Sequence, residues 1–283
     1  MKLGSLPPSK SASDFFTEDT EQFASNYSHK PSFCDRFSLF QSGVQRSAPA
    51  PAKVLDFGCG PGVIAAGVAR LGYDVLGTDG SAGMVQKSNT TASAAGLHNL
   101  RFELVDASSA TFSPQSFDIV ICSSVLEYLP EDKAVLAHLV ESLKLGGSLL
   151  VSVPNAWSLI GVVERSVRRF RRSKLLCVGR HFDFSIRHYS PSRFADQLSA
   201  FGMEVQGRTS FDFPLFGHAG VRLSRIPILG AMVMFESRRT RIVELFNGAQ
   251  RHEQGSMPRH SAEIAGGMPA GRQSEGRPNP PFV

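Results

Sequence analysis

Short apolar runs alternate with helical patterns along the middle of the chain. The runs that predict β-strands lie at residues 53–57, 73–78, 100–105, 117–122 and 148–153. Helices are predicted at 63–71, which Gly72 can close, and at 81–96 with Ser81 as its N-cap. Strands that alternate with helices in this way are typical of a parallel sheet covered on both faces.

A third helix is predicted from one apolar stripe before the fifth strand. The stripe consists of Leu136, Leu139, Val140 and Leu143, with Gly146 and Gly147 expected at its end. A fourth helix is predicted after Ser190, its N-cap, with Pro191 at the first helical position. Its inward residues are Phe194, Leu198 and Phe201, and Gly202 ends it. Two last strands are predicted at 204–213 and 230–236.

The pattern differs at both ends of the chain. Aromatic residues recur among polar ones in segment 14–48, and Phe33, Phe37, Phe40 and Val44 share one helical face. One or two helices packed across the main domain, 50–240, are therefore expected there. Residues 1–13 and 247–283 contain few large apolar side chains, so a flexible N-terminal tail and a disordered C-terminal tail are predicted.

The first strand runs into a turn with three alternating glycines. The segment reads Asp56-Phe57-Gly58-Cys59-Gly60-Pro61-Gly62. Without side chains, the glycines let the backbone take positive φ and let a ligand lie on its amide groups. A dinucleotide fingerprint would have its third glycine at Val63, and the phosphate loop of nucleotide hydrolases would need a Lys followed by Ser or Thr. Neither pattern is present.

The spacing Asp-x-Gly-x-Gly-x-Gly resembles the class I methyltransferases that use S-adenosylmethionine. The resemblance implies that the glycines pass close to the methionine part of the cofactor. It also implies that Asp56 supports the loop and the cofactor's amino group. A carboxylate inside the turn suits a cationic ligand better than a phosphate, which it would repel.

Two further strands end in acids. Asp79 lies 17 residues beyond Gly62 (79 minus 62), where a carboxylate can accept hydrogen bonds from both ribose hydroxyls of an adenosine cofactor. The alternative is a simple helix-entry Asp. The resemblance assigns Asp106, with the backbone of Ala107, to the adenine amino group; a turn-forming Asp would look the same in the sequence.

The segment after the fourth strand, 123–130, resembles the family's loop beside the methyl-donor sulfur. Many relatives carry His where this chain has Tyr128, and a phenol with a pKa near 10 is a poor general base at neutral pH. Glu127 is an alternative acid or base, or else a helix-capping or salt-bridge residue. Residues 143–154 resemble a further signature, so the resemblance extends over roughly 50–240. It implies a Rossmann-like α/β fold with a seven-stranded, mostly parallel sheet, helices on both faces and the last strand antiparallel.

Segment 187–194 is similar to small-molecule methyltransferases, including those of quinone biosynthesis. His188 is the best candidate to receive a proton from the acceptor, although a structural role is also open. The predicted catalytic residues are His188, Tyr128 and Glu127. The predicted cofactor-binding residues are Asp56, Gly58, Cys59, Gly60, Gly62, Asp79, Gly80, Asp106, Ala107 and Ser123.

Charge adds one feature to this interpretation. The chain of 283 residues has a formal charge of +5 and a pI near 9.2. Basic residues crowd segment 165–174, from Arg165 to Lys174, within an insertion expected at about 155–190. A basic amphipathic helix there would be a lid, and it could contact an anionic membrane or a lipid-linked acceptor; a merely solvated lid is the alternative. No stacking aromatics are interleaved with the arginines, so nucleic acid is not expected.

Cysteine usage and hydropathy exclude other classes. Four cysteines are scattered without a C-x-x-C pair or a His at ligand spacing, so neither a disulfide framework nor a metal site is expected. Cys59 and Cys122 are predicted to pack as small hydrophobic residues. No secretory signal and no membrane-length apolar run is present, which predicts a cytoplasmic protein, with peripheral membrane contact as an option.

The expected activity is methyl transfer from S-adenosyl-L-methionine to a small or lipid-linked acceptor, with oxygen as the expected atom. Two alternatives remain at this point. One is a nicotinamide-dependent oxidoreductase, which Val63 and the acid in the loop disfavour. The other is a non-catalytic, membrane-associated binding protein with the same fold. The oligomeric state is open.

Overall fold

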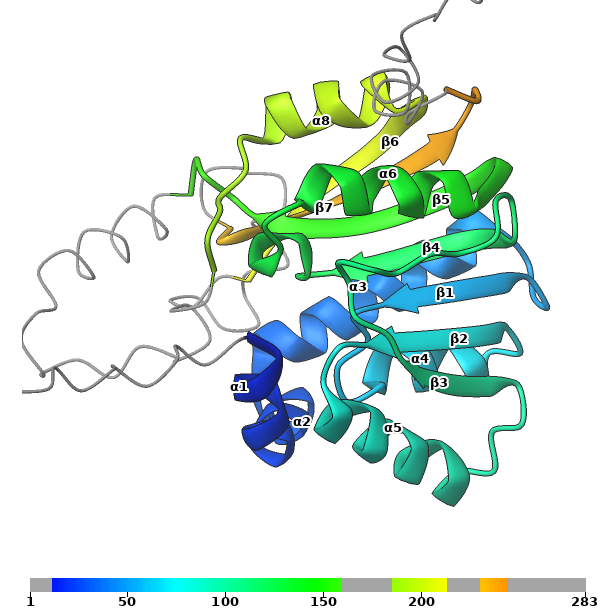
Figure 1. Ribbon diagram of the computed structural model, residues 1–283, viewed down its shortest axis with the longest axis vertical. Coiled ribbons are helices and arrows are strands. Elements are labelled where there is room, and N and C mark those ends of the chain that lie inside the picture. The colour runs from blue at the N-terminus through cyan, green and yellow to red at the C-terminus, as the bar shows by residue number, and fades with distance from the viewer. Residues whose placement is uncertain (1–11, 159–184, 213–229, 244–283) are drawn as a thin grey trace, which may run out of the picture. The chain divides into compact units, whose positions relative to one another are not determined.

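The computed structural model describes residues 12–158, 185–212 and 230–243, and its centre is a seven-stranded sheet (Figure 1). The strands lie in the order β3-β2-β1-β4-β5-β7-β6. Their bounds are β1 Lys53–Phe57, β2 Asp74–Asp79, β3 Leu100–Leu104, β4 Phe117–Ser123, β5 Leu143–Pro154, β6 Met203–Phe211 and β7 Met232–Arg239. The predicted fold class is confirmed, because β1 to β5 pair in parallel while β7 runs antiparallel to both β5 and β6.

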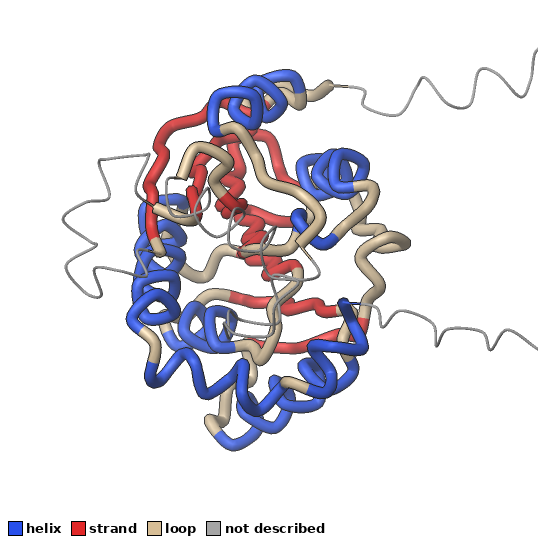
Figure 2. Tube along the Cα trace, turned by 90° about the vertical axis from the view of Figure 1, so that its left-hand side faces the viewer, coloured by secondary structure: helices blue, strands red, loops and turns tan. Residues whose placement is uncertain are grey.

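Helices lie on both sides of the strands (Figure 2). Their bounds are α1 Ala12–Glu18, α2 Thr20–His29, α3 Pro31–Ser47, α4 Val63–Arg70, α5 Ala82–Ala94, α6 Asp132–Ser142 and α8 Pro191–Ala200, with a 3₁₀ turn, η1, at Leu126–Tyr128. Where one or two helices were expected before the sheet, three are present. The extended backbone of Lys30 separates α2 from α3, and Pro31 begins α3 at its first position.

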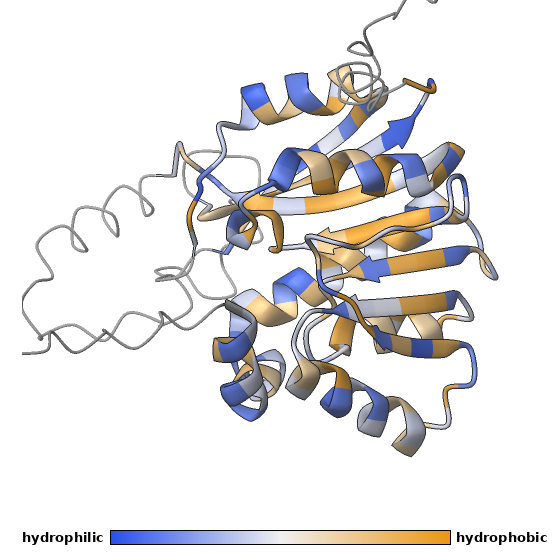
Figure 3. Cartoon of the chain, viewed as in Figure 1, coloured by the Kyte–Doolittle hydropathy of each residue, from blue (hydrophilic) through white to orange (hydrophobic). Residues whose placement is uncertain are grey.

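Alternate residues of the strands supply two cores. Leu55 of β1 packs in one cluster with Leu136 of α6 and Phe194 of α8. Its neighbour Val54 packs on the opposite face, in a second cluster with residues of α3, α4 and α5 such as Phe40. Both faces of the central strands are therefore apolar, as Figure 3 shows along β4 and β5.

The expected end of the third predicted helix is wrong. α6 ends at Ser142, and Leu143 already has the extended backbone of β5, where it pairs with Phe117. Gly146 and Gly147 lie inside β5 instead of ending the helix. Leu143 is fully buried, so it fits the apolar stripe of a helix and the core face of a strand equally well, and strand pairing decides between them.

Most other boundaries agree with expectation to within a few residues. Gly72 closes the turn after α4 with φ +92°, and Ser81 caps α5 by accepting a hydrogen bond from the Met84 amide. Ser190 is the N-cap of α8, but its hydroxyl lies near that of Ser192 and does not cap the helix. β6 ends earlier than expected because Asp212 takes positive φ, +62°.

Cys59 and Cys122 are free thiols and are buried, as predicted. Within the described ranges, no helix has the length and hydropathy needed to cross a bilayer. The basic segment Arg165–Lys174, most of the insertion expected at 155–190, and the expected tails at 1–11 and 247–283 lie outside the described residues. The boundary expected after residue 13 falls inside α1.

Candidate active site

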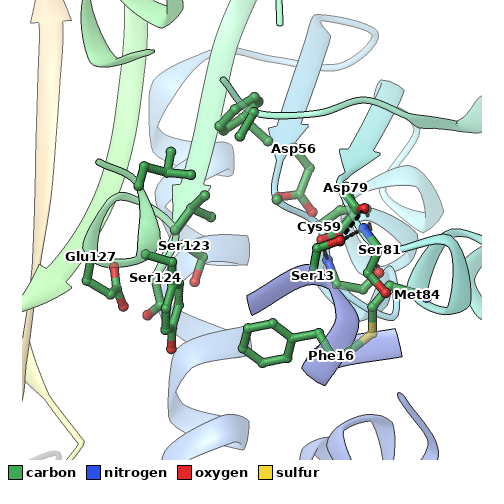
Figure 4. A pocket seen from close by; sticks show the side chains of 18 of the residues that line it. Ser13, Phe16, Asp56, Cys59, Asp79, Ser81, Met84, Ser123, Ser124 and Glu127 are labelled. Carbon is green, nitrogen blue, oxygen red and sulfur yellow. Dashed lines mark hydrogen bonds between the residues drawn. The ribbon is translucent and has the colours of Figure 1, made fainter. Parts of the chain in front are cut away.

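A cavity of about 620 Å³ opens where the parallel strands end. Its floor comes from the last residues of β1, β2, β4 and β5 and the loops that follow them, and α1 to α3 supply aromatic side chains on another side. In Figure 4, Asp56 points into the cavity from β1, with Glu127 on one side and Asp79 on the other. This position, outside the carboxyl ends of the strands, is where open α/β sheets bind ligands.

The glycine loop is held against the end of β2. The amides of Gly58 and Cys59 both donate to the carbonyl oxygen of Thr78, at 2.7 and 2.9 Å. Gly58, Gly60 and Gly62 all have positive φ, between 54° and 74°, as predicted. A Cβ on Gly58 would lie only 2.3 Å from Cγ2 of Val125, so that position requires glycine for space as well as for conformation.

The three loop glycines do not have the same surroundings. Gly58, Cys59 and Gly60 line the cavity, whereas Gly62 does not. A Cβ on Gly62 would lie 2.6 Å from the ring of Phe102, so this glycine allows the first turn of α4 to pack on the second core. Gly62 was predicted to contact the cofactor; in the structure it packs against Phe102 and is not among the residues that line the cavity.

Asp79 is bonded to two backbone amides. Its Oδ2 atom accepts from Gly60 at 2.8 Å and its Oδ1 atom accepts from Ser81 at 2.9 Å. Burial raises the pKa of this carboxyl, and the two amides act in the opposite direction. The helix-entry role is therefore present, but a carboxylate has about four acceptor positions, and two remain for a ligand in the cavity.

Asp106 is exposed and also lines the cavity. Its Oδ1 atom accepts from the hydroxyl and the amide of Ser108, at 2.7 and 2.8 Å, and these bonds lower its pKa. The turn-forming role that the sequence left open is thus real. Ala107 lines the same stretch of the cavity, so both residues predicted to contact an adenine reach the cavity.

Asp56 has a different environment. It is 1% exposed, and neither of its carboxylate oxygens has a hydrogen-bond partner among the residues that the structure describes. Burial, followed by the charge of Asp79, raises the pKa of this carboxyl to about 7. Burial of a charged carboxylate without a hydrogen-bond partner is energetically unfavourable, so this side chain is suited to a cationic or hydrogen-donating ligand.

Glu127 lies on η1 and is 2% exposed. Its Oε2 atom has no hydrogen-bond partner in the described part of the chain, and no salt bridge involves it there, so the expected salt-bridge role is not found. Burial raises the pKa of the Glu127 carboxyl to about 7, against the opposing charge of Arg36. The hydroxyl of Ser123, at the end of β4, is likewise buried and unpartnered within the described ranges.

Unpartnered polar atoms gather at this one cavity. Over the described residues, eight buried side-chain atoms lack a partner, and six of them belong to residues that line the cavity. These six are Nε of Arg36, Oδ1 and Oδ2 of Asp56, Oγ1 of Thr78, Oγ of Ser123 and Oε2 of Glu127. Buried polar atoms are rarely left unpaired in native proteins, so the cavity fits a polar ligand that pairs with them.

Tyr128 belongs to an aromatic wall. Its ring meets that of Phe16 edge to face, with centroids 5.5 Å apart, which joins η1 to α1. Phe16, Phe23, Tyr27 and Phe33 continue the wall through further edge-to-face contacts. Burial, and then the charge of Glu127, raises the pKa of the Tyr128 phenol, so the structure makes this side chain an even poorer base than its type implies.

Among the described residues that line the cavity, Arg36 is the only arginine or lysine, and an arginine side chain is always charged in proteins. It is 9% exposed, and its guanidinium lies 5.1 Å from the ring centroid of Phe33 and 5.8 Å from that of Phe211. Arg36 lies on α3 and Tyr27 on α2. Both line the cavity.

Some lining residues were not predicted from the sequence. Ser13 of α1 donates to the Gly80 carbonyl at 2.7 Å, and Thr17 shares a hydrogen bond with the Ser81 hydroxyl at 2.8 Å, so α1 is fixed to the loop after β2. Asp212 reaches the cavity from the end of β6. A strand-end acid is the pattern that drew attention to Asp79, and it would have drawn attention to Asp212 as well.

His188 lines the cavity from a segment without regular secondary structure, 185–188. The Ile186 amide donates to the Glu127 carbonyl at 2.9 Å, and the Tyr189 amide donates to the Pro154 carbonyl at 2.9 Å. The structure thus brings together all three predicted catalytic residues. It also places every predicted cofactor-binding residue except Gly62 on the same cavity.

Known proteins resemble this chain in sequence. A family model described as a methyltransferase domain matches residues 29–206. The ubiquinone biosynthesis O-methyltransferase of Sinorhizobium fredii is 30% identical over 182 residues, covering 61% of this chain and 69% of that protein. The mitochondrial ubiquinone biosynthesis O-methyltransferase of Schizosaccharomyces pombe is 30% identical over 159 residues, covering 56% of this chain and 55% of that protein. The chain therefore spans between 55% and 69% of the length of these two relatives.

A solved structure resembles it in fold. Magnesium protoporphyrin IX methyltransferase from Synechocystis, with bound SAH, superposes with a TM-score of 0.61 at 18% identity. The match covers 80% of this chain and 97% of that one. At this identity the likeness concerns the arrangement of helices and strands.

Proposed function

Because this chain belongs to the methyltransferase domain family and is an S-adenosyl-L-methionine-dependent methyltransferase, we propose that it methylates a hydroxyl oxygen of a small aromatic molecule. The single observation that carries the proposal is the cavity at the strand ends, with its glycine loop and its unpartnered acids. The names of the relatives support oxygen as the methylated atom. The aromatic wall supports a flat acceptor, because aromatic rings pack well against one another.

The lining of the cavity suits a cationic cofactor. Five acidic residues line it, and Arg36 is the only arginine among the described lining residues. The acids are Asp56, Asp79, Asp106, Glu127 and Asp212. A chain with a net charge of +5 thus has a cavity of the opposite sign. A sulfonium and an amino group are attracted to such a wall, whereas the diphosphate of a nicotinamide cofactor is repelled.

Most of the predicted cofactor residues have a proposed role. Asp79 accepts from the ribose hydroxyls with its two remaining acceptor positions, and Asp106 with Ala107 contacts the adenine. The backbone of Gly58 to Gly60 lies along the methionine part, and Asp56 pairs with the amino group. The guanidinium of Arg36, whose Nε is unpartnered among the described residues, supplies the donor for the methionine carboxylate.

The methyl group of the bound cofactor is already activated, because it is attached to a positively charged sulfur. The chain's own residues then need to orient the acceptor, exclude water and hold a proton. We assign the proton from the acceptor oxygen to His188. Glu127, when ionised, stabilises the positive charge that this proton creates on His188. Tyr128 positions the acceptor with its ring. Its raised pKa keeps the phenol protonated at neutral pH, so it cannot serve as the base.

A lipid-linked acceptor is a finer proposal. Trp157 and Ile186 are large apolar residues that are 49% and 57% exposed. They lie on neighbouring segments, since the Ala156 amide donates to the Tyr189 carbonyl at 2.9 Å. Two exposed apolar side chains beside the cavity would contact an apolar tail on the acceptor. Comparison of KM for acceptors with and without a prenyl tail tests this; equal values contradict it.

The deciding experiment measures cofactor binding and methyl transfer separately. We expect calorimetric titration to detect S-adenosylmethionine and its demethylated product, S-adenosylhomocysteine, and to detect neither NAD nor NADP. Incubation with methyl-labelled donor and a panel of phenols and catechols should yield a labelled methyl ether. Folded protein that binds neither sulfur compound would overturn the cofactor assignment, and label found on nitrogen or carbon would overturn the oxygen assignment.

A further inference from the structure

Asp132 is a buried carboxylate that binds two side chains from a distant part of the chain. It lies at the start of α6 and is 7% exposed. Its Oδ1 atom accepts from Nη1 of Arg187, and its Oδ2 atom accepts from the Tyr189 hydroxyl at 2.8 Å. Both partners come from the segment that precedes α8, and neither they nor Asp132 line the cavity.

Arg187 extends the same connection to the backbone. Its Nη1 atom also donates to the Leu129 carbonyl at 2.8 Å, and its Nη2 atom donates to the Pro130 carbonyl at 2.6 Å. These carbonyls belong to the turn that directly follows η1, the element that carries Glu127 and Tyr128. The Ile186 amide adds a bond to the Glu127 carbonyl at 2.9 Å.

His188 stands between the two side chains that Asp132 holds. Arg187 and Tyr189 reach Asp132, while His188 lines the cavity. The backbone of Tyr189 forms a parallel bridge with Asn155, which fixes the segment from its other side. His188 is therefore carried on a short stretch in which Arg187 is bound to the turn after η1 and Tyr189 is bound to Asp132 at the start of α6.

A purely structural contact at this place would not require charge. Replacing buried ion pairs by apolar residues of similar volume is often neutral or stabilising, and in some proteins a retained pair serves to fix one conformation. Arg187 presents its planar fork to one carboxylate and two carbonyls at once, which fixes both its position and its direction. Such a connection determines where the residue between its anchors lies.

We propose that Asp132 is a positioning residue of the active site, which acts through Arg187 and Tyr189 to hold His188 beside Glu127. The proposal rests on the proposed function in one respect, namely that His188 takes the proton from the acceptor. Asp132 itself has no contact with the cavity, so its loss changes the rate through the placement of His188 and leaves cofactor binding intact.

The test is a double-mutant cycle in the full-length protein. Asp132→Asn is expected to lower kcat by about 10-fold to 100-fold, because misplacement of a catalytic group by about 1 Å has an effect of this order. The Kd for S-adenosylmethionine should stay within about twofold of the wild-type value. In a His188→Gln background the same change should cost little further, because residues that act as a unit are non-additive. Full additivity of the two losses contradicts the proposal.

Two more variants separate positioning from stability. Tyr189→Phe removes one hydroxyl and keeps the ring packed against Phe194, so it replaces Asp132→Asn if that variant does not fold. Lys144→Met is the matched control. It removes the ion pair from Lys144 to Asp118, 2.7 Å long, at the opposite ends of β4 and β5 from the cavity. It should leave kcat unchanged; a loss equal to that of Asp132→Asn contradicts positioning.

A spectroscopic readout keeps this proposal distinct from the proposed function. If the wild type transfers no methyl group, the proposed function fails. The NMR signals of the imidazole rings of the chain's eight histidines then test whether Asp132 positions His188. The His188 signal is assigned by its loss in His188→Gln, with ¹³C-labelled histidine. In Asp132→Asn that signal should shift or broaden while the others stay in place. An unchanged His188 signal overturns the proposal.

Discussion

The carboxylate of Asp79 accepts a hydrogen bond from the Gly60 amide, with Oδ2 and the nitrogen 2.8 Å apart. This bond joins the end of β2 to the glycine loop that follows β1, two segments that are neighbours only because the strands pair in parallel. One side chain thus shapes the loop and faces the cavity. Cofactor binding and loop geometry should therefore change together when it is altered.

Asp79→Ala is expected to weaken binding of S-adenosylmethionine by about 10-fold to 100-fold, because hydrogen bonds to charged groups contribute about 1.5 to 3 kcal/mol. Asp74→Ala is the matched control, since Asp74 starts the same strand at its other end and its side chain is 42% exposed. Calorimetric titration of both variants measures the difference. Equal affinities for the two variants would remove the ribose assignment.

The sequence predicted those features that depend on local chemistry. Positive φ at Gly58, Gly60 and Gly62 followed from the spacing of residues that alone adopt it freely. The positions of Asp79 at the end of β2 and of Asp106 just beyond the end of β3 followed from apolar runs with acids after them. Because parallel strands end at one edge of a sheet, the predicted residues could be expected to meet there.

Other features depend on contacts between distant segments and left no local pattern. Leu143 fits a helix stripe, and only its pairing with Phe117 makes it a strand residue. Gly62 has the same spacing as its neighbours, but the ring of Phe102 takes the space beside it. Asp132 reads as an ordinary acid at the start of a helix until Arg187, 55 residues away, is found bonded to it.

Asp56 is expected to make the stability of the cofactor-free protein depend on pH. Its pKa is about 7 in the folded protein, against 3.8 for an unperturbed carboxyl. Between pH 3.8 and pH 7, folding is therefore accompanied by uptake of a proton at this carboxyl. The free energy of unfolding therefore falls as pH rises through this window and levels off above pH 7. The wild type should lose about 2.7 kcal/mol more than Asp56→Asn between pH 5 and pH 8. Urea unfolding at both pH values measures this; parallel losses would contradict the raised pKa.

Gly58→Ala tests whether the loop needs space or only conformation. Both Gly58 and Gly96 have positive φ, +69° and +61°, but a Cβ on Gly96 has no atom within 4 Å, whereas one on Gly58 lies 2.3 Å from Val125. Gly96→Ala should cost only the conformational strain, about 1 to 2 kcal/mol. Gly58→Ala should cost more and also weaken cofactor binding, and Val125→Ala in the same chain should recover part of the loss. Thermal unfolding that ranks the two single variants equally would contradict the steric argument.

Glu127→Gln is expected to reduce the pH dependence of methyl transfer. With a pKa of about 7, the Glu127 carboxyl is mostly neutral at pH 6 and mostly ionised at pH 8, so its stabilisation of a charged His188 grows over this interval. The increase in kcat between these pH values should be up to about tenfold smaller in the variant. Glu131→Gln, at an exposed residue on the same turn, is the control. Identical pH–rate profiles for the wild type and Glu127→Gln would exclude this role for Glu127.

Tyr128 separates the contribution of a ring from that of a hydroxyl. Burial moves the phenol pKa further above neutrality, so proton transfer by this group is unfavourable, whereas its ring closes the contact to Phe16 across the cavity. Tyr128→Phe should therefore change kcat by less than about threefold. Tyr128→Ala should raise KM for the acceptor by about tenfold, because it removes the aromatic wall at this place and an edge-to-face pair contributes about 0.5 to 1.5 kcal/mol beyond its buried area. Phe16→Ala removes the same contact from the other side and should raise KM to a similar extent, with little further loss in the double variant. A large loss of kcat in Tyr128→Phe would instead assign the proton transfer to the phenol.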